Sequence, residues 1–232
     1  MKKIGIIVFI GALVVGVLFS NLFSFGQASG RIFNFSLGRG IKGSGNTASE
    51  VRDLKGFKTV EVGGVFKVEI TAQKDFSVEV SADDNLLEKI RTEVEDGVLK
   101  ISTESRVNPS SPMIVRVSAP NIEHLDVSGV ANVTVSDLKN SSFGLDTSGA
   151  SKINLAGESD KVEIKVSGAS KIDAENLRSR AATVDSSGAS KITVFATESV
   201  RAEASGASKI VYAGGATDVV SNTSGASKVS PK

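Results

Sequence analysis

The chain contains no cysteine and no tryptophan, and its 232 residues include one histidine, His124, and one tyrosine, Tyr212. Without cysteine there is no disulfide framework, no thiol nucleophile and no lipid-accepting cysteine. His124 has no second histidine and no cysteine with which to share a metal ion, so we expect it to be a surface or turn residue. We expect no metal site and no cofactor.

Neither sign of charge is in excess. The chain has 27 Lys and Arg residues against 26 Asp and Glu residues, a formal net charge of +1. Removal of residues 1–28, which contain Lys2 and Lys3 and no acid, would leave 25 basic residues against 26 acidic ones. This balance gives no electrostatic reason to expect nucleic-acid binding.

The first residues are typical of an export segment. Lys2 and Lys3 precede an apolar stretch over residues 4–25, and Gly26-Gln27-Ala28 offers a small-residue cleavage position. One interpretation is a signal peptide, residues 1–28, that is removed. The other is an uncleaved hydrophobic helix over residues 4–25, which would rise about 33 Å and could anchor the chain in a membrane. Both interpretations place the remainder in the periplasm or at the cell surface.

Residues 29–55 are rich in glycine and show no sustained hydrophobic period, so we expect a flexible linker there. From Phe57 onward apolar and polar residues alternate, which predicts strands. Gly63-Gly64 marks a corner, Asp96-Gly97 predicts a hairpin turn, and residues 86–90 suit one helical turn. We assign residues 56–230 to one head domain whose N-terminal part is β-rich but less regular.

The motif Ser-Gly-Ala-Ser-Lys occurs five times in the C-terminal half. The copies lie at 148–152, 167–171, 187–191, 205–209 and 224–228, after a degenerate copy at 128–132. Counted from glycine to glycine, the spacings are 20, 19, 20, 18 and 19 residues. A fixed period near 20 is typical of a solenoid, whose successive coils stack on one another. We therefore expect glycines 149, 168, 188 and 206 to line up.

Apolar residues flank each corner, and a single coil cannot bury them alone. Coils stacked about 4.8 Å apart would join them into continuous columns. The residues that we expect inside are Leu125, Val127, Val133, Val135, Leu138, Leu145, Ile153, Leu155, Val162, Ile164, Val166, Ile172, Leu177, Val184, Ile192, Val194, Val200, Ala202, Ala204 and Ile210.

Within the motif, we expect the glycine to take a backbone conformation that other residues avoid and the alanine to fit a tight inner bend. The serines and lysines should form an exposed face, with the lysines as a like-charged ladder. Asp126, Asp146, Asp185 and Glu203, two residues before their serines, should point outward and partly offset that charge. The ladder is the candidate binding surface, and its residues are Lys152, Lys171, Lys191, Lys209 and Lys228.

Three further sequence patterns resemble known functional motifs, but their surroundings or spacing do not support those functions. Residues 38–43 match a dinucleotide fingerprint by letters, but no strand precedes them and no helix follows. In the repeated motif the lysine stands four residues after the serine, which is not the serine–lysine spacing of penicillin-recognising enzymes. The acids at positions 83, 84, 93, 95 and 96 lack the spacing of a calcium loop, so we expect a solvated turn.

The motif copies and the segment before them resemble a bacterial family, the putative auto-transporter adhesin, head GIN domain. The resemblance covers about residues 56–229 and implies an exported domain that folds as a right-handed single-stranded parallel β-helix. It brings no catalytic residues. The residues that carry it, besides the motif copies, are Gly56-Phe57, Val60, Val62, Gly64-Val65-Phe66, Val68, Ile70, Asp84-Asn85-Leu86-Leu87, Ile90, Asp96-Gly97, Leu99 and Ile101.

Three functions follow as hypotheses. The first, which we favour, is a noncatalytic surface or envelope interaction domain, adhesin-like or scaffolding, with a glycan among the ligands to test. The second is a polysaccharide lyase or hydrolase, by analogy of fold alone, but the acids are dispersed one per coil. The third is a self-assembling envelope filament, because residues 229–232 offer no evident cap to the last coil.

Overall fold

The structure, a computed structural model, describes residues 40–232. Over this range the chain is all-β, and its single helical element is the 3-10 helix η1, Asp84–Lys89, at the predicted helical turn. No helix in this range has the length and apolar character needed to cross a membrane. The signal peptide or anchor predicted over residues 1–28 and 4–25 lies outside the described residues.

The strands fall into an irregular N-terminal group and a repetitive C-terminal group. The first group is β1 Ile41–Lys42, β2 Thr47–Arg52, β3 Thr59–Ala72, β4 Ser77–Asp83, β5 Ile90–Glu95, β6 Val98–Thr103, β7 Val107–Asn108 and β8 Ile114–Ala119. The second group is β9 His124–Gly149, β10 Lys152–Gly168, β11 Lys171–Gly188, β12 Lys191–Phe195, β13 Ser199–Gly206, β14 Lys209–Ala213, β15 Asp218–Thr223 and β16 Lys228–Pro231.

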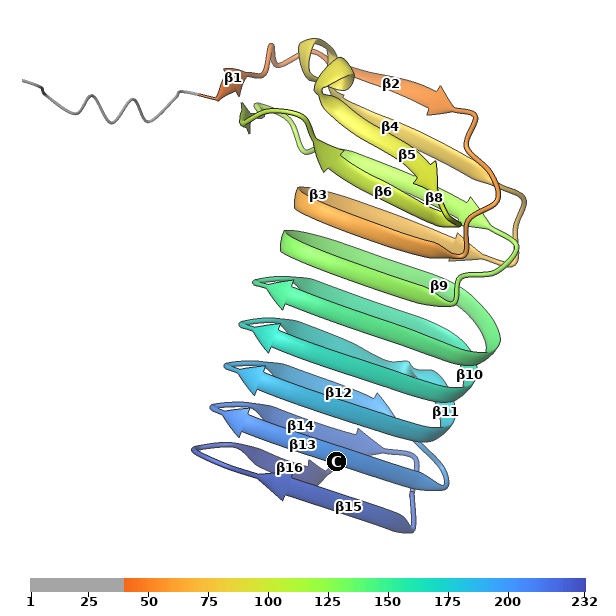
Figure 1. The fold of residues 1–232 in the computed structure, drawn as a ribbon, viewed down its shortest axis with the longest axis vertical. Helices are drawn as coiled ribbons and strands as arrows, with labels where there is room; N and C mark the ends of the chain where they lie inside the picture. Colours follow the sequence, from red (N-terminus) through yellow and green to blue (C-terminus); the bar gives the residue numbers. More distant parts are fainter. Residues whose placement is uncertain (1–39) are drawn as a thin grey trace, which may run out of the picture. The chain divides into compact units, whose positions relative to one another are not determined.

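Successive repeats lie beside one another in parallel register, as Figure 1 shows for β9 to β16. We call each pass of the chain around a Ser-Gly corner a rung. Gly149 is paired with Gly168, Gly168 with Gly188, and Gly188 with Gly206. The predicted alignment of the glycines is therefore confirmed, and identical motif letters lie over one another.

The first rung is β3, although it lies outside the regular sequence spacing of the repeats. Its Gly64 is paired with Gly129 of β9, so Gly63-Gly64-Val65 is one more corner of the same stack. Residues 73–123 are inserted between this rung and the next. They form strands that pair with the first rung and with one another, including the predicted hairpin of β5 and β6 at Asp96-Gly97.

The core consists of columns of apolar side chains that run through the stack. Every residue predicted to lie inside is buried. In one column Ile153, Ile172, Ile192 and Ile210 are aligned by the strand register and at most 1% exposed. Such columns supply the hydrophobic burial that no single rung could provide.

A second core column shrinks toward the C-terminal end. Leu145, Ile164, Val184, Ala202 and Ser221 are aligned in successive rungs, so the side chains are smaller toward the C-terminal end and the last member is polar. A polar outer face is what a terminal repeat needs in water. The last rung is polar at this position, but Val219 and Val229, aligned with the buried Val200 and Ile210, remain apolar, so the expectation that it offers no evident cap stays a prediction.

At the N-terminal end, antiparallel strands cover the stack. Strand β2 is antiparallel to β4, and β4 is antiparallel to β8. Strands β1 and β2 lie within residues 29–55, so the flexible-linker prediction is wrong for the part of that range that contains them. The glycines there permit close packing: a Cβ on Gly43 would lie 2.0 Å from Oδ2 of Asp83.

Asp83 organises this end of the molecule. Its side chain is buried, and it accepts hydrogen bonds from the backbone N–H groups of Ser110 at 2.7 Å, Gly45 at 3.0 Å and Ser111 at 3.1 Å. Burial alone would raise the pKa of Asp83, but these hydrogen bonds outweigh it and hold the pKa below its ordinary value. The solvated turn predicted at Asp83 is therefore wrong.

Replacing a corner glycine should destabilise the stack by steric contact as well as by backbone strain. Gly168 has a φ of +135°, and a Cβ there would lie 2.3 Å from the carbonyl oxygen of Gly149. We expect Gly168→Ala to lower the free energy of unfolding, measured by urea denaturation, by about 3 kcal/mol or more. Gly215→Ala is the matched control, since Gly215 also has a positive φ but open space around it. It should cost about 1–2 kcal/mol, and equal losses would contradict the steric explanation.

Removing the charge of Asp83 should have a pH-dependent effect. Since its pKa is lower in the folded chain, ionised Asp83 stabilises the fold above a pH of about 4, and this contribution is lost as pH falls through the folded pKa. Asp83→Asn should therefore lower the urea midpoint at neutral pH, and the difference from the natural chain should close in acid. Asp75→Asn, at an exposed carboxylate, is the control. A difference that does not change with pH would contradict this assignment.

Candidate functional site

The candidate site is the corner at which every rung turns. The chain approaches it from the strands on one side of the stack and leaves it along β12, β14 and β16 on the other side (Figure 1). At the corner the N–H of each alanine donates to the carbonyl of a glycine in the preceding rung, for example Ala169 to Gly149 at 2.8 Å. The corners thus form a continuous hydrogen-bonded edge.

The fourth letter of the motif forms a buried ladder of hydroxyl groups. Ser151, Ser170, Ser190 and Ser208 are at most 4% exposed. The hydroxyl of Ser170 donates to the carbonyl of Gly149 at 3.4 Å and accepts from the N–H of Ser151 at 3.1 Å. The prediction that both serines of the motif form an exposed face is therefore wrong for the second serine of each copy. Each copy turns this serine inward, where it satisfies backbone groups, and its first serine lies nearer the surface.

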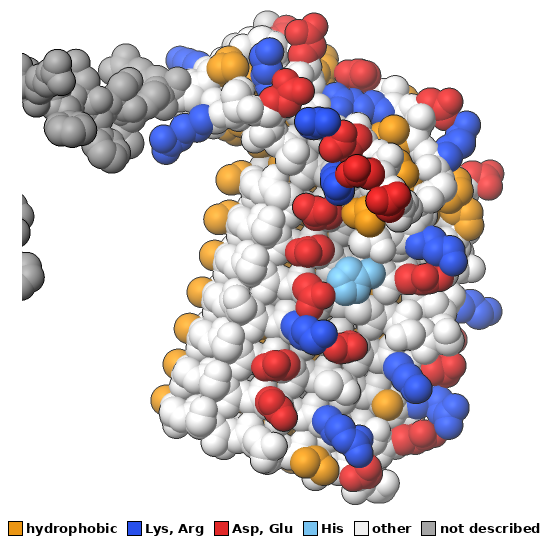
Figure 2. Space-filling model, viewed as in Figure 1, with side chains coloured by type: hydrophobic (Ala, Val, Ile, Leu, Met, Phe, Trp, Pro, Cys, Tyr) orange, Lys and Arg blue, Asp and Glu red, His pale blue; other side chains and the backbone are white. Residues whose placement is uncertain are grey.

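The third letter forms an apolar ridge on the outside. Val65 and Val130 are 61% and 55% exposed, and the alanines that continue their column are exposed as well: Ala150, Ala169, Ala189, Ala207 and Ala226. Figure 2 shows this line of hydrophobic side chains along one edge of the stack. The prediction that the alanines fit an inner bend is wrong, because it is the glycine beside them that approaches the neighbouring backbone.

On one side of the ridge lies the predicted lysine ladder. The strand register aligns Lys152, Lys171, Lys191, Lys209 and Lys228 in consecutive rungs, and all five are exposed. We call the strand segments that carry them the lysine face: residues 67–72, 132–136, 152–155, 171–174, 191–195, 209–213 and 228–231. Its charged residues are six lysines and only two acids, Glu69 and Asp173.

On the other side of the ridge the charge is reversed. We call these strand segments the acidic face: residues 59–63, 124–128, 142–148, 161–167, 181–187, 199–205 and 218–223. They carry seven acids and three bases. Figure 2 shows acidic side chains in a column beside the ridge, interrupted by a basic one. The acids expected to offset the lysine ladder therefore lie on a separate face.

The acidic face contains a shallow groove of about 310 Å³ around Lys165. The ammonium of Lys165 donates to Glu163 at 2.7 Å and lies near Asp146 and Asp185, so its pKa is raised. Burial raises the pKa of Asp126, Asp146 adds to the rise, and His124 opposes it. The carboxylates are thus spaced one per rung with a cation among them, rather than gathered as a pair.

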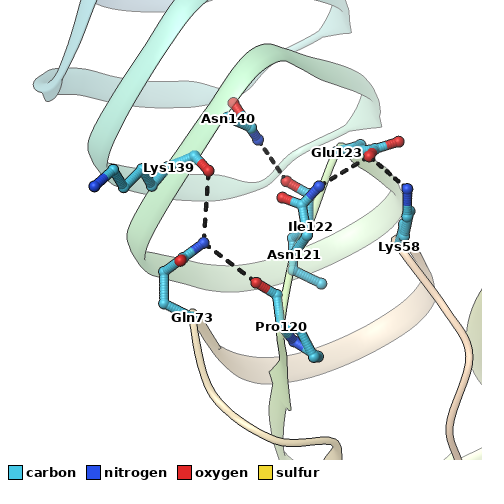
Figure 3. A network of polar contacts seen from close by, with 8 residues as sticks. All are labelled: Lys58, Gln73, Pro120, Asn121, Ile122, Glu123, Lys139 and Asn140. Carbon is cyan, nitrogen blue, oxygen red and sulfur yellow. Dashed lines mark hydrogen bonds and ion pairs between the residues drawn. The ribbon is translucent and has the colours of Figure 1, made fainter.

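His124 lies at the surface, as predicted, at the start of β9. Its Nε2 is 3.2 Å from Oδ2 of Asp146, and Gly144 leaves room for the ring, since a Cβ there would lie 2.3 Å from Nδ1. The preceding segment is held by polar contacts (Figure 3). The amide of Asn140 donates to the carbonyl of Ile122 at 2.8 Å, and Lys58 pairs with Glu123 at 2.9 Å. These contacts fix the chain where it returns from the inserted strands to the stack.

The family described as "Putative auto-transporter adhesin, head GIN domain" matches residues 56–216. No curated protein is similar enough in sequence to match the chain. Among solved structures, a putative adhesin from Bacteroides fragilis NCTC 9343 has a TM-score of 0.67 and 22% identity, over 83% of this chain and 100% of that one. A putative adhesin from Parabacteroides merdae ATCC 43184 has a TM-score of 0.53 and 16% identity, over 84% of this chain and 99% of that one.

A third solved structure is titled a putative lipid binding protein, from Parabacteroides distasonis ATCC 8503. Its TM-score is 0.52 and its identity 16%, over 84% of this chain and 100% of that one. At such identities the likeness shows a shared fold.

The two serines of one motif copy should differ sharply in their effect on stability. Ser170→Ala removes the acceptor of the Ser151 N–H and the donor to Gly149, so we expect the free energy of unfolding to fall by about 1–3 kcal/mol. Ser167→Ala, at an exposed position of the same copy, is the matched control and should stay within about 0.5 kcal/mol. Urea denaturation measures both, and similar losses would contradict the role of the buried ladder.

Proposed function

We propose, on the premise that this chain belongs to the family of putative auto-transporter adhesin head GIN domains, that it is a noncatalytic exported module that binds an envelope or cell-surface ligand. The family and two of the three solved structures are named as adhesins, and the third structure is named as a lipid binding protein. None of these names is that of an enzyme. The observation that carries the proposal is the pairing of a cationic and an acidic face along one rigid stack. Flat, regularly charged faces suit broad contact with another surface better than capture of a small molecule.

We infer further that the stack is a right-handed single-stranded β-helix. Parallel strands joined by crossover connections are right-handed in nearly all proteins, and the consecutive rungs pair in parallel with equivalent residues aligned. Export through the segment at residues 1–28, whether cleaved or kept as an anchor over 4–25, would place this module in the periplasm or at the cell surface.

The enzymatic alternative is less well supported. Glycoside hydrolysis needs two carboxyl groups flanking one bond, whereas Asp126, Asp146 and Asp185 are distributed along the acidic face with Lys165 among them. Within residues 40–232 no three Asp, Glu or His side chains are placed to share a metal ion. The filament alternative is opposed by two polar core positions of the last rung, Ser221 and Thr223, but favoured by the apolar Val219 and Val229 at two others.

The proposal predicts binding without turnover. The purified full chain, labelled with a fluorophore, should be retained by bacterial envelope and cell-surface preparations or by members of a glycan panel, and added salt should weaken the retention because exposed charges are screened. The same mixtures should release no reducing ends from uronate polymers. Lack of retention on every preparation would refute the proposal, and turnover abolished by an acid-to-amide change on the acidic face would replace it with the enzymatic alternative.

A further inference from the structure

We propose that the lysine face binds a linear anionic polysaccharide that carries a carboxylate on each sugar, with the polymer chain lying along the stacking direction. This inference rests on the proposed function and names the site and the ligand class. The five ladder lysines follow one another in consecutive rungs. At the spacing of adjacent strands, about 4.8 Å, the ladder spans about 19 Å. It therefore offers one positive charge per rung along a straight line.

The charges of the ladder are not neutralised within the molecule. Among the described residues, no ladder lysine has an acidic oxygen within 4.0 Å, although other lysines and arginines form twelve ion pairs, among them Lys165 with Glu163 on the acidic face. Like charges aligned at this spacing repel one another, and the register of the strands prevents their backbones from separating. A polymer with matching negative charges relieves this repulsion and releases the counterions of both partners.

A polar column beside the ladder favours a sugar polymer. Two residues after the five ladder lysines, on the same outward side of the strands, lie Asn154, Asp173, Thr193, Val211 and Ser230. Three of these five side chains, those of Asn154, Thr193 and Ser230, are uncharged hydroxyls or amides, which can both donate to and accept from sugar hydroxyls. The ladder holds lysines and no arginine, so it lacks the planar bidentate donors suited to phosphate.

The rest of the corner defines the limits of the site. The apolar ridge, including Val130 and Ala169, separates the ladder from the acidic face, where Asp146 and Asp185 would repel a polyanion. The polymer is thus confined to one side of the ridge. Its direction follows the ladder, because only along the ladder do lysines recur in every rung with a constant spacing.

The test uses the purified full chain and polygalacturonate, with its methyl ester as the neutral probe and double-stranded DNA as the phosphate probe. Binding is measured by titration calorimetry at several salt concentrations. The natural chain should bind polygalacturonate more tightly than either other probe. The triple variant Lys171→Gln, Lys191→Gln, Lys209→Gln should lose about ten-fold in affinity and show a weaker salt dependence.

The matched control is Lys74→Gln, Lys139→Gln, Lys161→Gln, which removes the same charge from three exposed lysines off the lysine face. It should keep its affinity within about two-fold. An equal loss in both triple variants, equal binding of the methyl ester, or DNA binding as tight as polygalacturonate would overturn the inference. Circular dichroism shows whether each variant is folded. If the triple variant is not folded, the single variant Lys191→Gln tests the site, and it should show a smaller loss of affinity for polygalacturonate.

The same variants separate this inference from the proposed function. If the ladder variant still adheres to envelope preparations as the natural chain does, the module binds surfaces through another face and the ladder site is wrong. If the natural chain adheres to no preparation, the proposed function fails whatever the result with polygalacturonate.

Discussion

The fold depends on how the backbone hydrogen bonds are satisfied at the corner, where the chain leaves one side of the stack for the other. Regular strand pairing is interrupted there, and every unpaired buried N–H or C=O would cost stability. The motif restores the pairing with three small residues. Glycine lets adjacent backbones approach, the alanine N–H donates to the glycine carbonyl of the preceding rung, and the inner serine bridges what remains. The glycine and the inner serine therefore have separate structural tasks at the corner, whereas the alanine contributes a backbone N–H.

The same register that satisfies the backbone determines the surface. Since equivalent residues lie over one another, a lysine that recurs at one motif position becomes a ladder, and acids that recur two residues before the motif become a column on another face. The apolar ridge lies between the two faces. A chain with almost no net charge thus presents two faces of opposite sign, which its overall composition does not reveal.

The periodic half of the molecule could be predicted from the sequence because its signal is repeated. Glycine spacing and alternation led to the aligned corners, the core columns and the lysine ladder. Strict alternation back from the buried Ile172 would also have placed Ser170 inside and Ala169 outside; the expectation of a bend with alanine inside overlooked it. Asp83, strand β2 and the first rung at Gly64 gave no such signal. Their positions depend on contacts between segments far apart in the chain, and the insert of residues 73–123 hides the period.

The tapering core has a mechanical consequence. In one core column the last rungs replace leucine and isoleucine with alanine and serine, and the strands of the final rung, β15 and β16, are largely exposed and have a partner on one side only. Under tension applied at the C-terminal end, we expect rungs to peel away from that end one at a time. Each would release a segment of nearly 20 residues, roughly 65 Å when extended, and leave the rungs beneath it paired. A head built in this way would lengthen stepwise under load before its capped end yields.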